Sequence, residues 1–272
     1  MTTDRLAQLT GVMRLELKKG LLGRRAVPIY LIGLVPLAPV LMFVLVSSLT
    51  EIPREFVGLG GATLFFILQF EFILRLIIYF GCVWVFMNLF RGEVIDRSLH
   101  YYFLTPIRRE ILVAGKYLSG WLTATVVFGG ATAVCFVIVY AYLGAAGGGD
   151  VLGAATILTL LRYLAVVTLA CLGYGAVFLV VGLFLRSIII PAFLIFVWEM
   201  ANPVLPAALK KVSVLFYLQG LRPLPPPDAP IQIIAEPVSI WIAIPGFLVF
   251  TAVTLFAAAL RIRRMEIAYG SD

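Results

Sequence analysis

The sequence has few charged residues for its length. Of the 272 residues only 13% are Asp, Glu, Lys or Arg, whereas 62% are hydrophobic. A soluble domain carries about a quarter charged residues to cover its surface, so this composition excludes an ordinary soluble protein and indicates a polytopic membrane protein. Each helical crossing takes about 20 residues. The length therefore allows several crossings and leaves no room for a second, soluble catalytic domain.

Histidine and cysteine are also scarce. His100 is the single histidine, which excludes a histidine-based metal site within one chain. The three cysteines, Cys82, Cys135 and Cys171, all lie within apolar runs. We therefore predict that they are packing residues rather than disulfide partners.

Motifs for catalysis are missing as well. The sequence has no Gly-x-Ser-x-Gly elbow and no His-Glu-x-x-His pair. Residues 114–116, AGK, match only the end of a phosphate-binding loop. Tyr117 stands where that loop requires Ser or Thr, and Glu110 occupies the position of its first glycine. We predict that the chain binds no nucleoside triphosphate or other cofactor and is not itself an enzyme. Energy for any transport must then come from a partner or an ion gradient.

Long apolar runs are what the sequence has in abundance, and they predict an all-α fold with six transmembrane helices. The predicted spans are residues 27–49, 62–90, 112–143, 155–185, 188–206 and 237–260. Between the last two, residues 207–236 contain the short apolar stretch VSVLFYLQGL and the helix-breaking stretch RPLPPPDAP. This segment is predicted to be a re-entrant segment on the outer face of the membrane.

Residues 1–25 are predicted to form an amphipathic helix. Its apolar residues recur at helical spacing and leave Arg14 and Lys18 on the other side. These apolar residues are Leu6, Leu9, Met13, Leu17 and Leu21. An ordinary soluble helix would show the same pattern, but Arg24 and Arg25 directly precede the first span, which favours a helix lying along the cytoplasmic membrane face.

The distribution of basic residues predicts the orientation. Only four Lys and Arg residues fall on the predicted outer side, and these are Arg54, Lys210, Lys211 and Arg222. Most others lie in the N-terminal helix, in residues 91–111 or after the last span. Since basic residues collect on the cytoplasmic side, we expect both termini and residues 91–111 to be cytoplasmic.

Four charged residues fall within the predicted spans. Glu71 and Arg75 are four residues apart on one face of the second span, where an ion pair can form. Arg162 lies in the fourth span and Glu199 in the fifth. An uncompensated charge near the bilayer centre costs about 3 kcal/mol on insertion scales, so these side chains are expected to face the bundle interior, a partner subunit or a watery cavity.

Two interpretations of these charges stay open. Glu71, Arg75 and Glu199 could line a substrate path, with Asn202 beside them at the helix break that Pro203 predicts. Alternatively, Glu71 neutralises Arg75, or Arg162 and Glu199 clamp helices together. Structural ion pairs are common, and the sequence alone does not separate the two interpretations.

Residues 91–111 form a dense charged and aromatic segment between the second and third spans. The polar and aromatic residues of its first part are Glu93, Asp96, Arg97, His100, Tyr101, Tyr102 and Phe103. The segment breaks near Pro106 and resumes with Arg108 and Arg109. A short helix rich in aromatic residues suits docking in a groove of another protein, but a loop with its aromatics among lipid headgroups has the same composition.

The stretch YYFLTPIRREILVAGKYLSGWL resembles the cytoplasmic hairpin of ABC-2 type transporter permeases. Their pattern of Leu-x-Pro-x-Arg followed by Gly-Lys is matched by Leu104, Pro106, Arg108, Gly115 and Lys116. The N-terminal helix, the six spans and the irregular segment before the last span also resemble that family, so the resemblance covers nearly the whole chain. The motif itself is loose. No outer loop is long enough for the large extracellular domain that some members carry.

The resemblance implies a permease subunit of an ATP-driven transporter, an exporter, in a bacterial inner membrane. Two copies would pair as a homodimer, with substrate passing between them, and two ATP-binding subunits would bind ATP and Mg beneath them. Residues 93–104 would form the coupling helix. We also expect membrane lipids to be partners of the chain, and we expect it not to bind nucleic acid.

Two rival classes remain. A secondary transporter or channel needs no ATPase, but such folds commonly contain inverted repeats, and residues 1–143 do not resemble residues 144–272. A non-transporting scaffold or enzyme subunit would use residues 91–111 only to dock a protein. Purification with an ATPase partner would separate both from the transporter interpretation.

Overall fold

The structure is a computed structural model. It describes residues 2–23, 26–49, 68–95, 109–145, 153–185, 187, 189–221 and 239–263. Within these ranges all regular secondary structure is helical, in agreement with the predicted all-α class. Because no strand occurs in the described part, every apolar segment there satisfies its backbone hydrogen bonds within a helix, as lipid requires.

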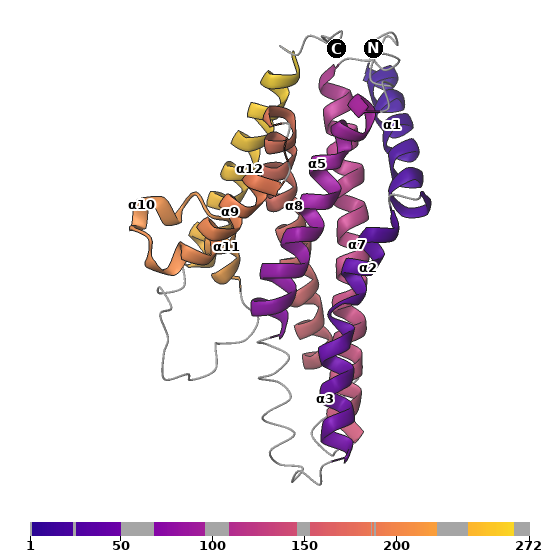
Figure 1. The fold of residues 1–272 in the computed structure, drawn as a ribbon, viewed down its shortest axis with the longest axis vertical. Helices are drawn as coiled ribbons and strands as arrows, with labels where there is room; N and C mark the ends of the chain where they lie inside the picture. The colour runs from indigo at the N-terminus through magenta and orange to yellow at the C-terminus, as the bar shows by residue number, and fades with distance from the viewer. Residues whose placement is uncertain are drawn as a thin grey trace.

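The helices follow the chain in the order shown in Figure 1. The first half contains α1 (Thr2–Leu22), α2 (Ala26–Leu34), α3 (Leu37–Leu49), the π-helix η1 (Leu68–Ile78), α5 (Tyr79–Ile95) and α7 (Arg109–Ala145). The second half contains α8 (Ala154–Phe184), α9 (Ile189–Ala201), the 3-10 helix η2 (Asn202–Val204), α10 (Ala207–Lys210), α11 (Val214–Gln219) and α12 (Ile240–Arg263).

The described chain contains five helical stretches long and apolar enough to cross a membrane. These are Ala26–Leu49, Phe72–Leu89, Glu110–Gly144, Ala154–Phe184 and Ile240–Ile262. The first has a turn at Val35 and Pro36 between α2 and α3, because proline lacks the backbone donor that a continuous helix requires. Several apolar helices of this length indicate a multi-pass membrane protein.

The fifth predicted span, residues 188–206, differs from the structure. Here α9 has 13 residues and ends at Ala201, where η2 begins. A helix of this length reaches about 20 Å, which is less than the hydrocarbon thickness of about 30 Å. The cause is local, because Pro203 removes a backbone donor and stops the α-helix. The prediction joined α9 to this break as one span.

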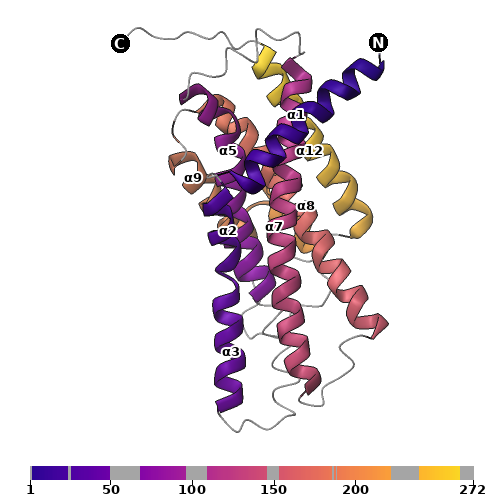
Figure 2. The ribbon, with the colours of Figure 1, turned by 90° about the vertical axis from the view of Figure 1, so that its right-hand side faces the viewer.

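The helices form a bundle around α7 and α8 (Figure 1). Both α5 and α12 pack on α8, and α1 lies along α7. In Figures 1 and 2 the start of α1, the end of α5, the start of α7 and the end of α12 lie at one end of the molecule, and the end of α3 lies at the opposite end. The two helix ends that flank residues 96–108 are therefore close to the N-terminal helix.

Aromatic rings packed against glycines hold the bundle together. Phe86 of α5 is buried between Gly120 of α7 and Gly175 of α8, and a Cβ atom at Gly175 would lie only 2.4 Å from its ring. Phe128 packs in the same way on Gly81. Small residues allow such close approach in membrane helices. The packing thus depends on glycine at defined positions.

The three cysteines are also part of this core. Cys82, Cys135 and Cys171 are fully buried and form no disulfide. Their position agrees with the predicted role as small packing residues.

Candidate functional site

Two polar clusters interrupt the apolar core. We call the first the junction; it consists of Glu16 and Lys19 of α1, Leu89 of α5 and Lys116 of α7. We call the second the hairpin cluster. It consists of Tyr79 of α5, Tyr174 of α8, Glu199 of α9, Asn202 of η2 and Ser213 at the start of α11.

Lys116 is the centre of the junction. Its side chain is fully buried, and Nζ donates to Glu16 Oε1 at 3.0 Å and to the carbonyl oxygen of Leu89 at 3.2 Å. Glu16 is itself only 9% exposed. Lys19 Nζ lies 3.6 Å from the same Glu16 oxygen, at the solvent side of the pair. One buried ion pair therefore joins α1 to α7 and, through Leu89, to α5.

Close helix packing surrounds this ion pair. A Cβ atom at Gly115 would lie 2.8 Å from Val12, and one at Gly20 would lie 2.9 Å from the hydroxyl of Thr123. Glycine at these two positions lets the backbones of α1 and α7 approach, which brings Glu16 within reach of Lys116. The ion pair of the junction is thus part of the close packing between α1 and α7 and is not a solvent-exposed pair.

The junction corrects the predicted face of α1. The stripe facing α7 is Val12, Glu16 and Gly20, of which the first two are buried and Gly20 is half-buried, whereas Leu6, predicted to be on the apolar face, is 63% exposed. The other predicted apolar residues, Leu9, Met13, Leu17 and Leu21, are half-buried, and the prediction missed Glu16. The sequence did contain a signal for this face. Val12, Glu16 and Gly20 are spaced four residues apart, so they share one side of a helix, and the acid stands between a β-branched residue and a glycine.

The junction lies at the base of the charged segment predicted to dock a partner. Lys116 sits two turns into α7, and Leu89 lies in α5, whose last turn contains Glu93. Eight predicted docking residues lie outside the described ranges, namely Asp96, Arg97, His100, Tyr101, Tyr102, Phe103, Pro106 and Arg108. Their docking role stays a prediction, and the structure describes the frame from which they project.

Glu199 is the centre of the hairpin cluster. Its carboxylate is buried and accepts hydrogen bonds from the Ser213 hydroxyl at 2.7 Å, from Val214 N at 3.0 Å and from Leu215 N at 3.1 Å. The Ser213 hydroxyl in turn accepts from Phe216 N at 3.3 Å. These bonds satisfy backbone N–H groups that the first turn of a helix leaves without partners. Glu199 therefore fastens α11 to α9.

Two further hydrogen bonds close the hairpin that α9, η2, α10 and α11 form. Asn202 Nδ2 donates to the carbonyl oxygen of Lys210 at 3.4 Å, and the Tyr217 hydroxyl donates to the carbonyl oxygen of Lys211 at 2.9 Å. Asn202 is buried. The hydrogen bonds of Glu199 with residues 213–215 and of Asn202 with Lys210 thus lie within their own hairpin, and a role for either in a substrate path stays a prediction.

Tyr79 connects the hairpin to the rest of the bundle. Its hydroxyl donates to the carbonyl oxygen of Ala192 at 2.7 Å, and its ring packs edge-on against Tyr174 and Phe178. Tyr174 interacts with the Glu199 carboxylate through its hydroxyl and lies within electrostatic range of Arg75. The structure thus brings two predicted path residues, Arg75 and Glu199, near one tyrosine.

The other predicted charges behave differently. Glu71 lies in η1, but its side chain is outside the description, so its pairing with Arg75 stays a prediction. Arg162 is exposed on α8, while the described partners of Glu199 come from α11 and Tyr174. The proposed clamp between Arg162 and Glu199 is therefore not what holds Glu199.

The backbone around Glu71 and Arg75 also departs from the expected α-helix. Residues 68–78 form a π-helix, with hydrogen bonds between residues five apart. Such segments are rare and recur at functional sites. In the described residues no group of three His, Cys, Asp or Glu side chains is placed to hold a metal ion. Neither cluster therefore has the composition of a metal centre.

Comparisons with known proteins give no assignment, because no family model matches the chain and no curated protein is significantly similar to it in sequence.

Proposed function

We propose that this protein is the permease subunit of an ATP-driven transporter of the ABC-2 type, working as an exporter. In this proposal two copies pair in a bacterial inner membrane, each crossing it six times with both termini in the cytoplasm. The five long apolar stretches supply five crossings, and the short helix α9 supplies the other. Separate ATPase subunits bind ATP and Mg. The substrate passes between the two copies, near Glu71 and Arg75, and the hairpin that Glu199 and Asn202 fasten borders this path.

The observation that carries the proposal is the junction. A fully buried ion pair links the N-terminal helix to both helices that flank the charged and aromatic segment. A segment that only reversed the chain between two spans would need no such support. A segment that receives force from a partner does, because a displacement must reach the transmembrane helices without being lost in local bending. Lys116 is also part of the motif on which the resemblance depends.

The test is to replace Tyr101, Tyr102 and Phe103 together with alanine and to measure association with an ATP-binding partner and transport in membrane vesicles. We expect both to fall at least tenfold, since buried aromatics supply much of the energy of an interface. The matched control replaces Phe193, Trp241 and Phe256, three exposed aromatics on α9 and α12, and should leave the association unchanged.

Two outcomes would contradict the proposal. Unchanged association and transport in the triple variant would remove the docking role from this segment. Transport by the purified chain alone, without any ATPase, would instead identify a secondary transporter or channel.

A further inference from the structure

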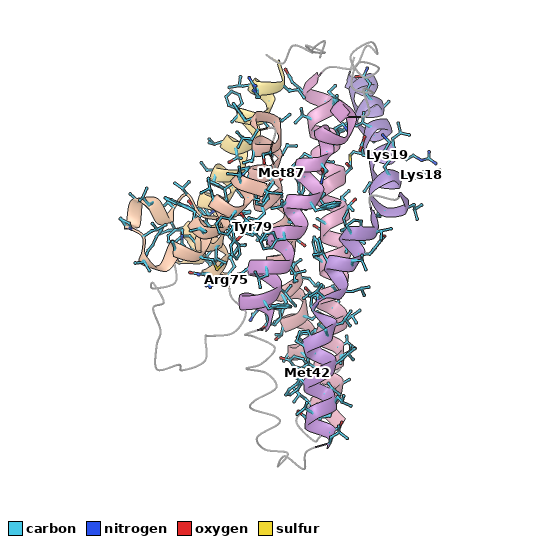
Figure 3. All side chains as sticks on the ribbon, viewed as in Figure 1. Lys18, Lys19, Met42, Arg75, Tyr79 and Met87 are labelled. Carbon is cyan, nitrogen blue, oxygen red and sulfur yellow. The ribbon has the colours of Figure 1, made fainter. Side chains whose placement is uncertain are left out.

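The side of α1 that faces away from α7 is basic and also carries exposed leucines. We call this the outward face of α1, and it consists of Arg14, Leu15, Lys18, Lys19 and Leu22. Leu15 is 58% exposed and Leu22 is 80% exposed. Lys18 points away from the bundle (Figure 3). Basic side chains and leucines share one exposed strip, which is a composition suited to the boundary between headgroups and acyl chains.

The junction fixes which side of α1 faces outward. Glu16 is the only acidic residue between residues 6 and 23, and it is turned inward against Lys116. Rotation of α1 would pull this carboxylate away from a fully buried lysine. Arg14 and Lys18 therefore stay on the outward face, while Glu16 is held by Lys116 and Lys19 in the junction.

A second observation places this face at the edge of the lipid. The Tyr30 hydroxyl of α2 donates to the carbonyl oxygen of Leu21 at 3.0 Å, which fastens the end of α1 to the start of the first candidate span. Shortly after Leu22, Val27 and Leu31 of α2 are also exposed. Tyrosine is typical of the membrane boundary, so Arg14, Lys18 and Lys19 lie within one or two turns of it.

We infer that the outward face of α1 binds acidic phospholipid headgroups. The guanidinium of Arg14 and the ammonium group of Lys18 would pair with lipid phosphates, while Leu15 and Leu22 enter the acyl boundary. Basic clusters beside a transmembrane helix bind anionic lipids in this way. An acidic protein surface would also attract the charges, but it would leave two highly exposed leucines without a reason. The inference depends on α2–α3 being a membrane span and does not depend on the ATPase.

The test uses the burial of the native cysteines. Gly11 is exposed, and a Cβ atom at this position would meet nothing within 4 Å. The three native cysteines are buried, so a polarity-sensitive fluorophore would attach at the exposed thiol that Gly11→Cys introduces. The labelled full-length protein is placed in nanodiscs of phosphatidylcholine alone or mixed with phosphatidylglycerol. We expect a blue shift in the mixed discs that high salt reverses.

Matched variants locate the effect. Arg14→Gln with Lys18→Gln should remove most of the blue shift, whereas Lys210→Gln with Lys211→Gln, at the end of α10, should leave it intact. A Thr10→Cys label on the same helix provides a second site if Gly11→Cys fails to fold. Equal emission in both lipids, or equal loss in both double variants, would overturn the inference. A shift that appears only when an acidic protein partner is added would assign the face to that partner instead.

Discussion

A fully buried lysine persists in an apolar bundle only when its charge has a partner, and Lys116 has Glu16 at 3.0 Å. Removing one member of such a pair leaves the other charge buried and uncompensated, which costs about 3–5 kcal/mol. Removing both with residues of similar size costs much less. The two residues are therefore expected to behave as one unit.

We predict that Lys116→Met strongly lowers the thermal unfolding temperature of the purified protein, and that Glu16→Gln added to it restores part of the loss. A double-mutant cycle measures the coupling energy. The control is Lys18→Met, an exposed change on the same helix as Glu16, which should shift stability by less than about 0.5 kcal/mol. Strictly additive losses at Glu16 and Lys116 would show that the pair contributes nothing.

A second prediction concerns Glu199, whose carboxylate accepts hydrogen bonds from two backbone N–H groups at the start of α11. Glu199→Ala leaves these buried donors unsatisfied, at about 1–3 kcal/mol for each. We expect protease cleavage within residues 202–221 to become faster and the unfolding temperature to fall. Asn202→Ala, which removes one longer bond of 3.4 Å, should have a smaller effect. The reverse order of the two variants would place the anchor at Asn202.

For Glu71 and Arg75 the prediction concerns the yield of folded protein. If the two side chains pair, Glu71→Gln alone should lower the yield more than Glu71→Gln with Arg75→Gln, because the double variant leaves no unmatched charge in the membrane. The measurement is size-exclusion chromatography of a fluorescent fusion in detergent. A double variant that loses the sum of the two single losses would show that each charge acts separately.

Among the elements, α8 shows most clearly how glycine permits the helix packing. A Cβ atom at Gly175 would clash with the ring of Phe86, whereas one at Gly130 of α7 would meet nothing within 4 Å. Both glycines lie inside long apolar helices, so the same substitution tests packing at one site and helix propensity at the other.

We predict that Gly175→Ala destabilises the protein by about 1–3 kcal/mol, the usual range for overpacking, and that Gly130→Ala is neutral or slightly stabilising. Thermal unfolding of both variants in the same detergent measures the difference. Adding Phe86→Leu to Gly175→Ala should recover part of the loss, since it removes the clashing ring. Equal effects of the two alanine variants would mean that the contact between Phe86 and Gly175 is not tight in the membrane.

How far the elements could be predicted depended on whether local sequence determines them. The helices α7, α8 and α12 lie within a few residues of their predicted spans because length and hydropathy alone define them. Pro203 marks the end of α9 in the sequence, although the predicted span ran past it, whereas the π-helical backbone of η1 has no marker in the pattern of apolar residues. Hydropathy reports which segments prefer lipid, but it does not report their hydrogen-bond register.

For the candidate site the limit was different. The sequence marked Glu199 and Lys116 as unusual, but only the fold shows that the first caps α11 and the second meets Glu16. The two partners of the junction are separated by 100 residues, and a pattern of helical spacing relates only residues a few positions apart. Long-range pairs of this kind require the packing of whole helices.

On the scale of the whole molecule, one end of the bundle gathers the features that the proposed function uses. The start of α1, the end of α12 and the helix ends flanking residues 96–108 all lie there (Figures 1 and 2). The hairpin of α9 to α11 lies beside α8, on the other side of the bundle from α1 and α2 (Figure 1). A transporter of the proposed type needs this separation between a force-receiving end and a path-bordering element.

The long separation between Glu16 and Lys116 also has a consequence for biosynthesis. When a ribosome has made Glu16, about 100 residues must still be added before its lysine exists, which takes roughly 5–20 s at ordinary rates of translation. During that time α1 lacks α7, the helix on which it packs, while α2, α3 and α5 are already made. The N-terminal helix therefore docks late, and its docking reports that the first three apolar stretches have been assembled in order.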